Sequence, residues 1–253
     1  MRFDELDTRL RQYETLHDSF VLPDVHMVVR LDGRGFTKKA DDVWRLNRPF
    51  DDTFHHAMTK TTEHLMNTGF RVVYGYTQSD EISLLLHIND DSFNRKTRKI
   101  ISLLAGEASG VFSLIMNAPA SFDTRICELP NPKLVQDYFS WRQEDAHRNA
   151  LNTHCYWLLR KQGQSPKASA DFLLHKSVGE KHELLFQNGI NFNDIPPWQK
   201  RGVGIYWQDT HKDGFNPKTG EQTVALRRTL VVDDNLPIYD EYREMIGGML
   251  GWF

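Results

Sequence analysis

Short, nearly unbroken apolar runs divide the first half of the chain. Residues 25–31 and 82–88 are rich in Val, Ile and Leu, which is typical of buried β-strands. Residues 71–76 and 122–129 have the same character, and a short polar turn joins 71–76 to 82–88 as a hairpin. The pattern therefore predicts four strands before residue 130.

Apolar residues with helical spacing separate these strands. Residues 50–67 and 97–117 repeat apolar positions every three or four residues, which predicts a helix at each. The same spacing over residues 3–13 predicts an amphipathic helix at the start of the chain, whereas residues 33–49 are expected to form a long loop. The resulting order is βαββαβ, the ferredoxin-like arrangement, so the predicted fold class is α+β.

This order has a consequence for the acidic residues at the strand ends. Asp32 ends the first strand, while Asp80 and Glu81 open the third. In this topology the first and third strands are antiparallel neighbours, so their two ends meet at one edge of the sheet. Asp and Gly are also common in ordinary turns. The convergence nevertheless favours a site that holds divalent cations over a nucleoside triphosphate.

The pattern changes beyond residue 130. Residues 132–161 are predicted to form one long helix, and a Gly-, Gln- and Ser-rich linker is expected at 163–169. Short helices should follow, then strands at 203–208 and 222–232 joined by a loop rich in Gly, Asn and Pro, and a helix at 239–246.

The long helix carries a stripe of polar residues. Arg142, Asp145, Asn149 and Asn152 follow spacings of three, four and three, which aligns them on one face. The stripe contains Asn and Arg but neither Lys nor Glu, which favours hydrogen-bonded contacts over simple solvation.

Composition limits the function classes. With 253 residues, 40% of them hydrophobic, we expect a palm-like catalytic core at 1–129 and a C-terminal helical and β appendage, packed on it, at 130–253. A net charge of −3 gives no general attraction for nucleic acid. Any RNA contact must come from local patches, such as residues 95–99 or the pair Lys200-Arg201.

The remaining features bear on location. Cys127 and Cys155 lack CxxC spacing and are expected to be reduced thiols. The charged start of the chain is unlike a signal peptide, and no apolar run reaches the length of a membrane span. A cytoplasmic protein without a membrane partner is therefore expected.

Six segments form a combination that is more specific than any one of them. They are RLDGRGF (30–36), QSDEISLLL (78–86), FDTR (122–125), YFSWRQEDAHRNALNTHCYW (138–157), KHELLFQNGIN (181–191) and WQKRGVGIYW (198–207). In this order they resemble the tRNA-His guanylyltransferase family of 3′-to-5′ polymerases. The resemblance implies a polymerase-type palm that activates a tRNA 5′ end with ATP. The 3′-hydroxyl of an incoming nucleotide would then attack that end.

The resemblance also implies roles for individual residues. Asp32, the Gly33 carbonyl and Asp80 match the ligands of two Mg²⁺ ions, and Glu81 matches a further acidic position counted with the catalytic residues. The residues implied to bind GTP, ATP or another nucleoside triphosphate are Arg34, Gly35, Phe36, Arg48, Ser79, Arg125, Lys181 and Asn191.

The tRNA partner is expected to meet the long helix. His147 and Asn149 match the family's HxN motif, which is implied to face RNA. Arg142 on the same helix and the pair Lys200-Arg201 complete the expected tRNA-binding set. The resemblance further implies a homotetramer.

Three departures from the family pattern concern recognition rather than metal binding. Thr37 stands where the guanylyltransferases commonly have His, Arg48 replaces a lysine, and Ala150 replaces an Asn. These changes favour the "like" branch of the family, which repairs 5′-truncated tRNAs by templated addition. Two alternatives stay open at this point, a palm-fold nucleotide cyclase and a catalytically silent tRNA-binding module. The absence of a GGDEF-type turn weakens the first, and intact Asp32 and Asp80 weaken the second.

Overall fold

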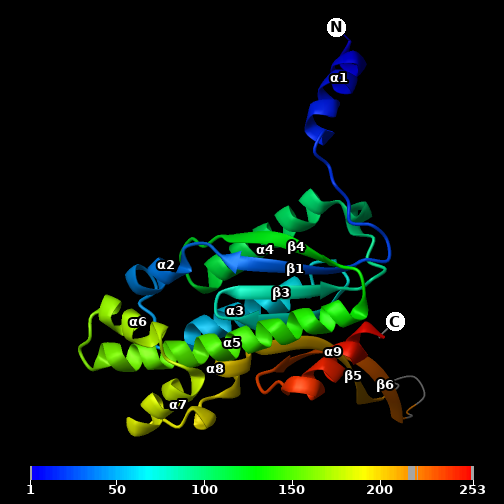
Figure 1. Ribbon diagram of the computed structural model, residues 1–253. Coiled ribbons are helices and arrows are strands. Elements are labelled where there is room, and N and C mark those ends of the chain that lie inside the picture. Colours follow the sequence, from blue (N-terminus) through cyan, green and yellow to red (C-terminus); the bar gives the residue numbers. More distant parts are fainter. Residues whose placement is uncertain (1, 216–219, 221, 252–253) are drawn as a thin grey trace.

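A computed structural model describes residues 2–215, 220 and 222–251 of the chain. Its centre is one antiparallel sheet with the strand order β4-β1-β3-β2-β5-β6 (Figure 1). The strands are β1 (His26–Gly33), β2 (Val72–Gln78), β3 (Glu81–Leu86), β4 (Phe122–Leu129), β5 (Val203–Phe215) and β6 (Gln222–Asp233). The first four strands have the predicted βαββαβ order, which confirms the ferredoxin-like arrangement.

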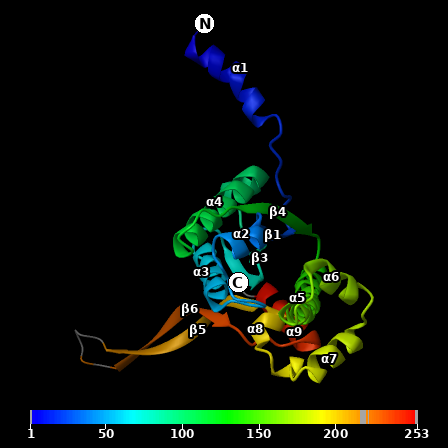
Figure 2. The ribbon, with the colours of Figure 1, turned by 90° about the vertical axis from the view of Figure 1, so that its left-hand side faces the viewer.

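Helices cover both faces of the sheet (Figure 2). The helices in the described residues are α1 (Phe3–Thr15), α2 (Phe36–Asp42), α3 (Asp52–Leu65), α4 (Thr97–Ile115), α5 (Pro132–Lys161), α6 (Pro166–Leu174), α7 (Val178–Gln187), α8 (Pro197–Arg201) and α9 (Tyr239–Leu250). Single 3₁₀ turns lie at Ser92–Arg95 and Phe192–Asp194. Helices α3 and α4 pack on one face, and α5 and α9 on the other.

The two faces explain why the strands are apolar without alternation. On β1, Val29 and Leu31 point toward α3 and α4, where Leu104 is fully buried. Val28, which precedes Val29, points the other way and packs in the same cluster as Phe139 of α5. A strand that is covered on both sides must carry apolar residues at successive positions.

The segment predicted as a loop at 33–49 contains helix α2 instead. Its start depends on Gly35, which adopts a left-handed φ of 69° that glycine accepts readily. The next residue, Phe36, is buried and stacks on Phe112 with ring centres 5.0 Å apart. Packing of this one ring, rather than a repeating apolar pattern, fixes the segment as a helix.

Other boundaries also differ from the prediction. The expected linker at 163–169 includes the start of α6, where the Ser165 hydroxyl accepts a hydrogen bond from the Ala168 amide at 3.2 Å. Strand β5 continues to Phe215 instead of ending at 208. The rest of the predicted loop, at 216–219 and 221, lies outside the described residues.

Residues beyond 130 extend the same layers. Helix α5 crosses the sheet face, while β5 pairs with β2 and adds β6 at the edge. A third apolar cluster joins the second half of α5 to α6 and α7 through Leu151, Leu173 and Leu185. Helix α1 forms as predicted but stands away from the body, with none of its residues buried (Figure 1).

Candidate active site

Asp32 and Asp80 lie at the same end of two neighbouring central strands, as predicted. Asp32 of β1 is directly opposite Glu81 of β3 in the antiparallel register. The Gly33 amide donates a hydrogen bond to the Asp80 carbonyl oxygen at 3.0 Å. Residues that are far apart in the chain therefore share one edge of the sheet.

The turn that carries Asp80 has only two residues. Strand β2 ends at Gln78 and β3 begins at Glu81, so Ser79 and Asp80 form the whole connection. Ser79 adopts a left-handed φ of 52°, as tight hairpin turns require. Its hydroxyl donates to Asp80 Oδ1 at 3.2 Å, which orients that carboxylate.

Electrostatics at this edge favour a bound cation. Burial, and to a smaller extent the negative charges of Asp32 and Glu81, raise the pKa of Asp80 to about 6. A hydrogen bond from Ser79 acts in the opposite direction. A carboxyl group that is partly desolvated and faces another carboxylate gains most from a nearby positive charge.

The donor set fits a hard divalent cation. Asp32 and Asp80 offer carboxylate oxygens, and Gly33 offers a backbone carbonyl between them, which are the ligands that Mg²⁺ prefers. Within the described residues, no three His, Cys, Asp or Glu side chains converge to form a complete metal cage. Such sparse protein ligation is usual where water and substrate phosphates complete the shell of Mg²⁺.

Glu81 is held differently from the two aspartates. One of its oxygens accepts a short hydrogen bond from Arg30, and the other lies 3.3 Å from Nη1 of Arg142. Arg30 also lies 4.0 Å from Asp32. The sequence reasoning gave Arg30 no role, although its position two residues before Asp32 puts both on one strand face.

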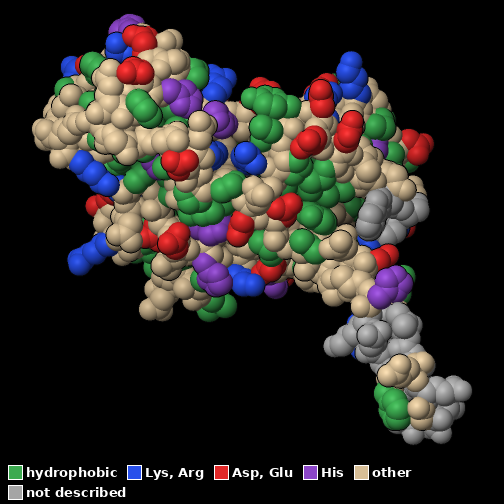
Figure 3. Space-filling view, turned by 90° about the horizontal axis from the view of Figure 1, so that it is seen from below, with side chains coloured by type: hydrophobic (Ala, Val, Ile, Leu, Met, Phe, Trp, Pro, Cys, Tyr) green, Lys and Arg blue, Asp and Glu red, His purple; other side chains and the backbone are tan. Residues whose placement is uncertain are grey.

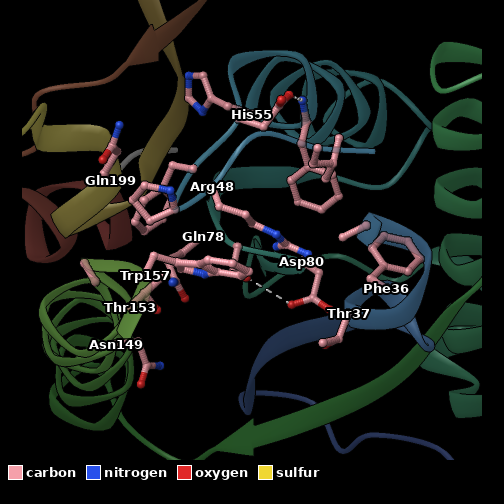
Figure 4. A pocket seen from close by; sticks show the side chains of 18 of the residues that line it. Phe36, Thr37, Arg48, His55, Gln78, Asp80, Asn149, Thr153, Trp157 and Gln199 are labelled. Atoms are coloured by element: carbon pink, nitrogen blue, oxygen red, sulfur yellow. Dashed lines mark hydrogen bonds between the residues drawn. The ribbon is translucent and has the colours of Figure 1, made fainter. Parts of the chain in front are cut away.

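A cavity of about 730 Å³ opens beside the carboxylates, between α2, α3, the β2–β3 turn and α5 (Figure 4). Asp80 and Ser79 line it, and so do aromatic side chains that the sequence reasoning did not assign to a site. These are Phe50, Phe54, Tyr156, Trp157 and Trp198. Pockets of 300–1,000 Å³ that combine aromatic walls with a few polar groups commonly bind small molecules.

Arg48 crosses this cavity close to Trp157 (Figure 4). Its guanidinium carbon is 5.2 Å from the centre of the indole ring, within the range of a cation–π contact. It also makes a short ion pair with Asp41 of α2. Thr37, on the same helix, lies on the opposite wall. The cavity thus brings together Thr37 and Arg48, and it is also lined by Ala150, the third residue that departs from the family pattern.

The other residues implied to bind nucleotide have mixed placements. The exposed side chain of Arg125 lies 3.9 Å from Asp32 and 3.1 Å from Asp123, so it joins the carboxylate edge. Arg34 is also exposed and its amide donates to Ser121. The ring of Phe36 lies in the aromatic core, although it reaches the cavity wall.

Lys181 and Asn191 are not among the described residues that line the cavity. The Lys181 ammonium donates to Asn152 at 3.0 Å, and Asn152 does line it. Asn191 instead caps the 3₁₀ turn that follows it, accepting from the Asn193 amide at 3.1 Å.

Two members of the predicted tRNA-binding set are buried in the structure. Lys200 is 7% exposed, and its ammonium donates to the carbonyls of Phe192 and Asn193, so it is no surface cation. Arg142 is 6% exposed and forms an ion pair with Glu81. Both charges are therefore occupied by contacts within the protein.

The other three members of the set remain accessible at least in part. Arg201 is half-buried and donates to the Leu236 carbonyl at 2.9 Å. His147 and Asn149 are exposed, and Asn149 lines the cavity. Asn149 also donates to Asp145 at 3.3 Å, which confirms that the polar stripe is hydrogen-bonded.

The basic run at 95–99 is also not a free patch. Arg95 is buried and donates to the carbonyls of Ile88 and Val25, while Lys96 and Arg98 both pair with Asp18. On the face shown in Figure 3, Lys and Arg side chains are interspersed with Asp and Glu.

Within the described part of the chain, no helix is long and apolar enough to cross a membrane.

Comparison with known families agrees with this geometry. Residues 7–130 match the family described as "Thg1: tRNAHis guanylyltransferase", and residues 133–239 match "Thg1 C terminal domain". The chain belongs to the tRNA(His) guanylyltransferase family. The tRNA(His) guanylyltransferase of Schizosaccharomyces pombe is 32% identical over 248 residues, which cover 89% of this chain and 92% of that protein.

Other relatives are longer than this chain. The match spans 40% of tRNA(His) guanylyltransferase 1 of Arabidopsis thaliana, at 28% identity, and 66% of the probable mouse enzyme, at 31%. Among solved structures, a bacterial "tRNA(HIS) Guanylyltransferase (Thg1)-Like Protein in complex with ATP" has a TM-score of 0.75 at 27% identity, covering 98% of this chain and all of that one. The guanylyltransferase of Saccharomyces cerevisiae has a TM-score of 0.71 at 27% identity, covering 81% and 93%.

Proposed function

We propose that this chain is a Mg²⁺-dependent nucleotidyltransferase that adds nucleotides to the 5′ end of tRNA in the 3′-to-5′ direction. The observation that carries the proposal is the pair Asp32 and Asp80 at one sheet edge, beside a cavity large enough for a nucleotide. Family membership supports the reaction class. Structures of a bacterial Thg1-like protein in complex with ATP and in complex with GTP support nucleoside triphosphates as substrates.

Different residues of the chain would bind the metal, the phosphates, the base and the tRNA. Asp32, Asp80 and the Gly33 carbonyl would hold Mg²⁺, which when bound activates an attacking hydroxyl and neutralises phosphate charge. Arg125, exposed beside Asp32, would bind phosphate oxygens through its planar guanidinium. The aromatic wall with Trp157 would receive the base of the nucleotide. His147 and Asn149, exposed on α5, would contact tRNA.

The substrate choice within the family follows from the cavity. Thr37 offers a hydroxyl that cannot stack on a base as imidazole can, and the charge of Arg48 is already paired with Asp41. Templated addition instead takes its selectivity from the 3′ strand of the acceptor stem. We therefore propose that repair of 5′-truncated tRNAs is faster than addition of an extra guanosine to full-length tRNA-His.

The test is incubation of the chain with Mg²⁺, ATP, labelled nucleoside triphosphates and a panel of full-length and 5′-truncated tRNAs. Asp32→Asn and Asp80→Asn, which remove a charge without changing shape, should each abolish addition. Asp171→Asn, on an exposed position of α6, is the matched control and should leave the rate unchanged.

Each negative result has a distinct meaning. Full activity in both site variants would refute the metal site. A clear preference for full-length tRNA-His would refute the repair assignment alone. Cyclic products from GTP or ATP in the absence of RNA would indicate a nucleotide cyclase.

A further inference from the structure

A chain of alternating charges connects α5 to the carboxylate edge. Nη1 of Arg142 lies 3.3 Å from Glu81 Oε2, and the other oxygen of Glu81 pairs with Arg30. Nη2 of Arg30 lies 4.0 Å from Asp32 Oδ2. The series Arg142–Glu81–Arg30–Asp32 therefore runs from a buried helix residue to a proposed metal ligand.

The same arginine is also tied to the cavity wall. Arg142 lies 3.7 Å from Asp145, one helical turn further along α5. Asp145 accepts a hydrogen bond from Asn149, and Asn149 lines the cavity. Arg142 is thus the only described residue here that pairs with both Glu81 and Asp145.

The ion pairs of Arg142 and Arg30 are largely shielded from solvent. The side chain of Arg142 is 6% exposed, and that of Arg30 is 18% exposed. A buried guanidinium needs hydrogen-bond acceptors, and neighbouring carboxylates also offset the loss of hydration of its charge. Glu81 provides one oxygen to each arginine, so its carboxylate is directed toward α5.

We infer that Arg142 is a positioning residue that acts through Glu81, and that Glu81 is an anchor for two arginines and not a metal ligand. By fixing Glu81, Arg142 fixes Arg30 and thereby the orientation of Asp32. The inference rests on the proposed function for its kinetic readout. It explains why a buried arginine and an acidic strand residue face each other beside the site.

A double-mutant cycle separates position from charge. Arg142→Met and Glu81→Gln should each lower kcat for nucleotide addition at least about tenfold, with the KM for the nucleotide within about threefold. If Arg142 acts through Glu81, the double variant should be no slower than the slower single variant. Arg142→Lys, which keeps the charge, should recover part of kcat and serves if Arg142→Met does not fold.

Binding of Mn²⁺, followed by electron paramagnetic resonance, needs no turnover. Glu81→Gln removes a negative charge and should weaken Mn²⁺ binding, whereas Arg142→Met should strengthen it. The double variant changes no net charge, so its Mn²⁺ affinity should return to within about threefold of the wild type while kcat stays low. Asp32→Asn should lose Mn²⁺ binding in every background.

The control is another arginine that pairs with α5. Arg243 of α9 lies 2.7 Å from Asp137 of α5, at the end of the helix remote from Asn149. Arg243→Met should leave kcat and Mn²⁺ affinity unchanged.

Three results would overturn the inference. Multiplicative losses of kcat in the double variant would mean that the two residues act independently. A double variant that binds Mn²⁺ as weakly as Glu81→Gln would make Glu81 a ligand. Recovery of kcat together with Mn²⁺ affinity would leave only an effect of charge. If no variant and no wild type adds nucleotides, the proposed function fails, and the Mn²⁺ measurements still decide whether Glu81 is a ligand.

Discussion

Trp157 offers the sharpest test of how the cavity would hold a nucleotide. Its indole lines the cavity from α5, with the Arg48 guanidinium 5.2 Å from the ring centre. We expect the base of a bound nucleoside triphosphate to stack on this ring. Trp157→Ala removes the stacking surface and leaves Asp32 and Asp80 intact.

The size of the effect follows from known stacking energies. Replacing an aromatic residue under a base with alanine costs about 1–3 kcal/mol. At 25 °C this corresponds to a Kd that is weaker by about 5- to 150-fold. The cation–π contact with Arg48, worth about 0.5–1 kcal/mol at a partly solvated site, is already present without a nucleotide and is not counted in this change of Kd.

Calorimetric titration with Mg·GTP or Mg·ATP measures the Kd directly. Trp157→Phe keeps an aromatic face and should bind within about threefold of the wild type. Trp157→Leu keeps apolar volume without a π face and should resemble Trp157→Ala. Binding unchanged by Trp157→Ala, or fully restored by Trp157→Leu, would refute base stacking at this wall.

Two further predictions concern residues that the sequence presents ambiguously. Arg95→Ala should lower the free energy of unfolding by about 3–5 kcal/mol in urea titrations, because it leaves the carbonyls of Ile88 and Val25 without their buried donor. Lys99→Ala, at an exposed position, is the control. Equal stabilities of the two variants would contradict this role of Arg95. Burial raises the pKa of the Cys155 thiol to about 11. At pH 7.5, mass spectrometry should therefore find this thiol unmodified by N-ethylmaleimide in the folded protein and modified in urea. Rapid modification of the folded protein would show instead that the thiol is accessible.

The strand pattern could be predicted because the buried runs are unambiguous. Val28 and Val29 face opposite sides of the sheet, and helices cover both sides. The unbroken apolar run therefore indicates a strand that is buried on both faces. Few sheet topologies are compatible with the order βαββαβ. The order of strands and helices therefore predicted that Asp32 and Asp80 lie close together.

Helix α2 and the cavity wall could not be derived in the same way. Phe36 holds α2 by packing on Phe112, a contact between residues far apart in sequence that local composition does not reveal. Trp157 has helical spacing on α5, which is equally typical of a core residue. Its exposure to the cavity depends on Arg48 and its neighbours crossing from another segment.

Charge was the least reliable guide. Lys200 and Arg95 stand in basic runs typical of a solvated or nucleic-acid-binding surface, yet both are buried with backbone carbonyls as acceptors. Those acceptors come from turns and loops whose positions only the folded chain defines. Arg30 was more accessible to reasoning, because strand alternation already puts it on the face of Asp32.

The most direct test of the account is the position of the label after reaction with GTP labelled at the α-phosphate. A 5′-truncated tRNA is incubated with the chain, Mg²⁺, ATP to activate its 5′ end, and the labelled nucleotide, and the product is mapped by end-specific nuclease digestion. The account predicts label joined at the 5′ end in the wild type and in Asp171→Asn, and none in Asp32→Asn or Asp80→Asn. Label at the 3′ end, or 5′ label that persists without Asp32 and Asp80, would contradict it.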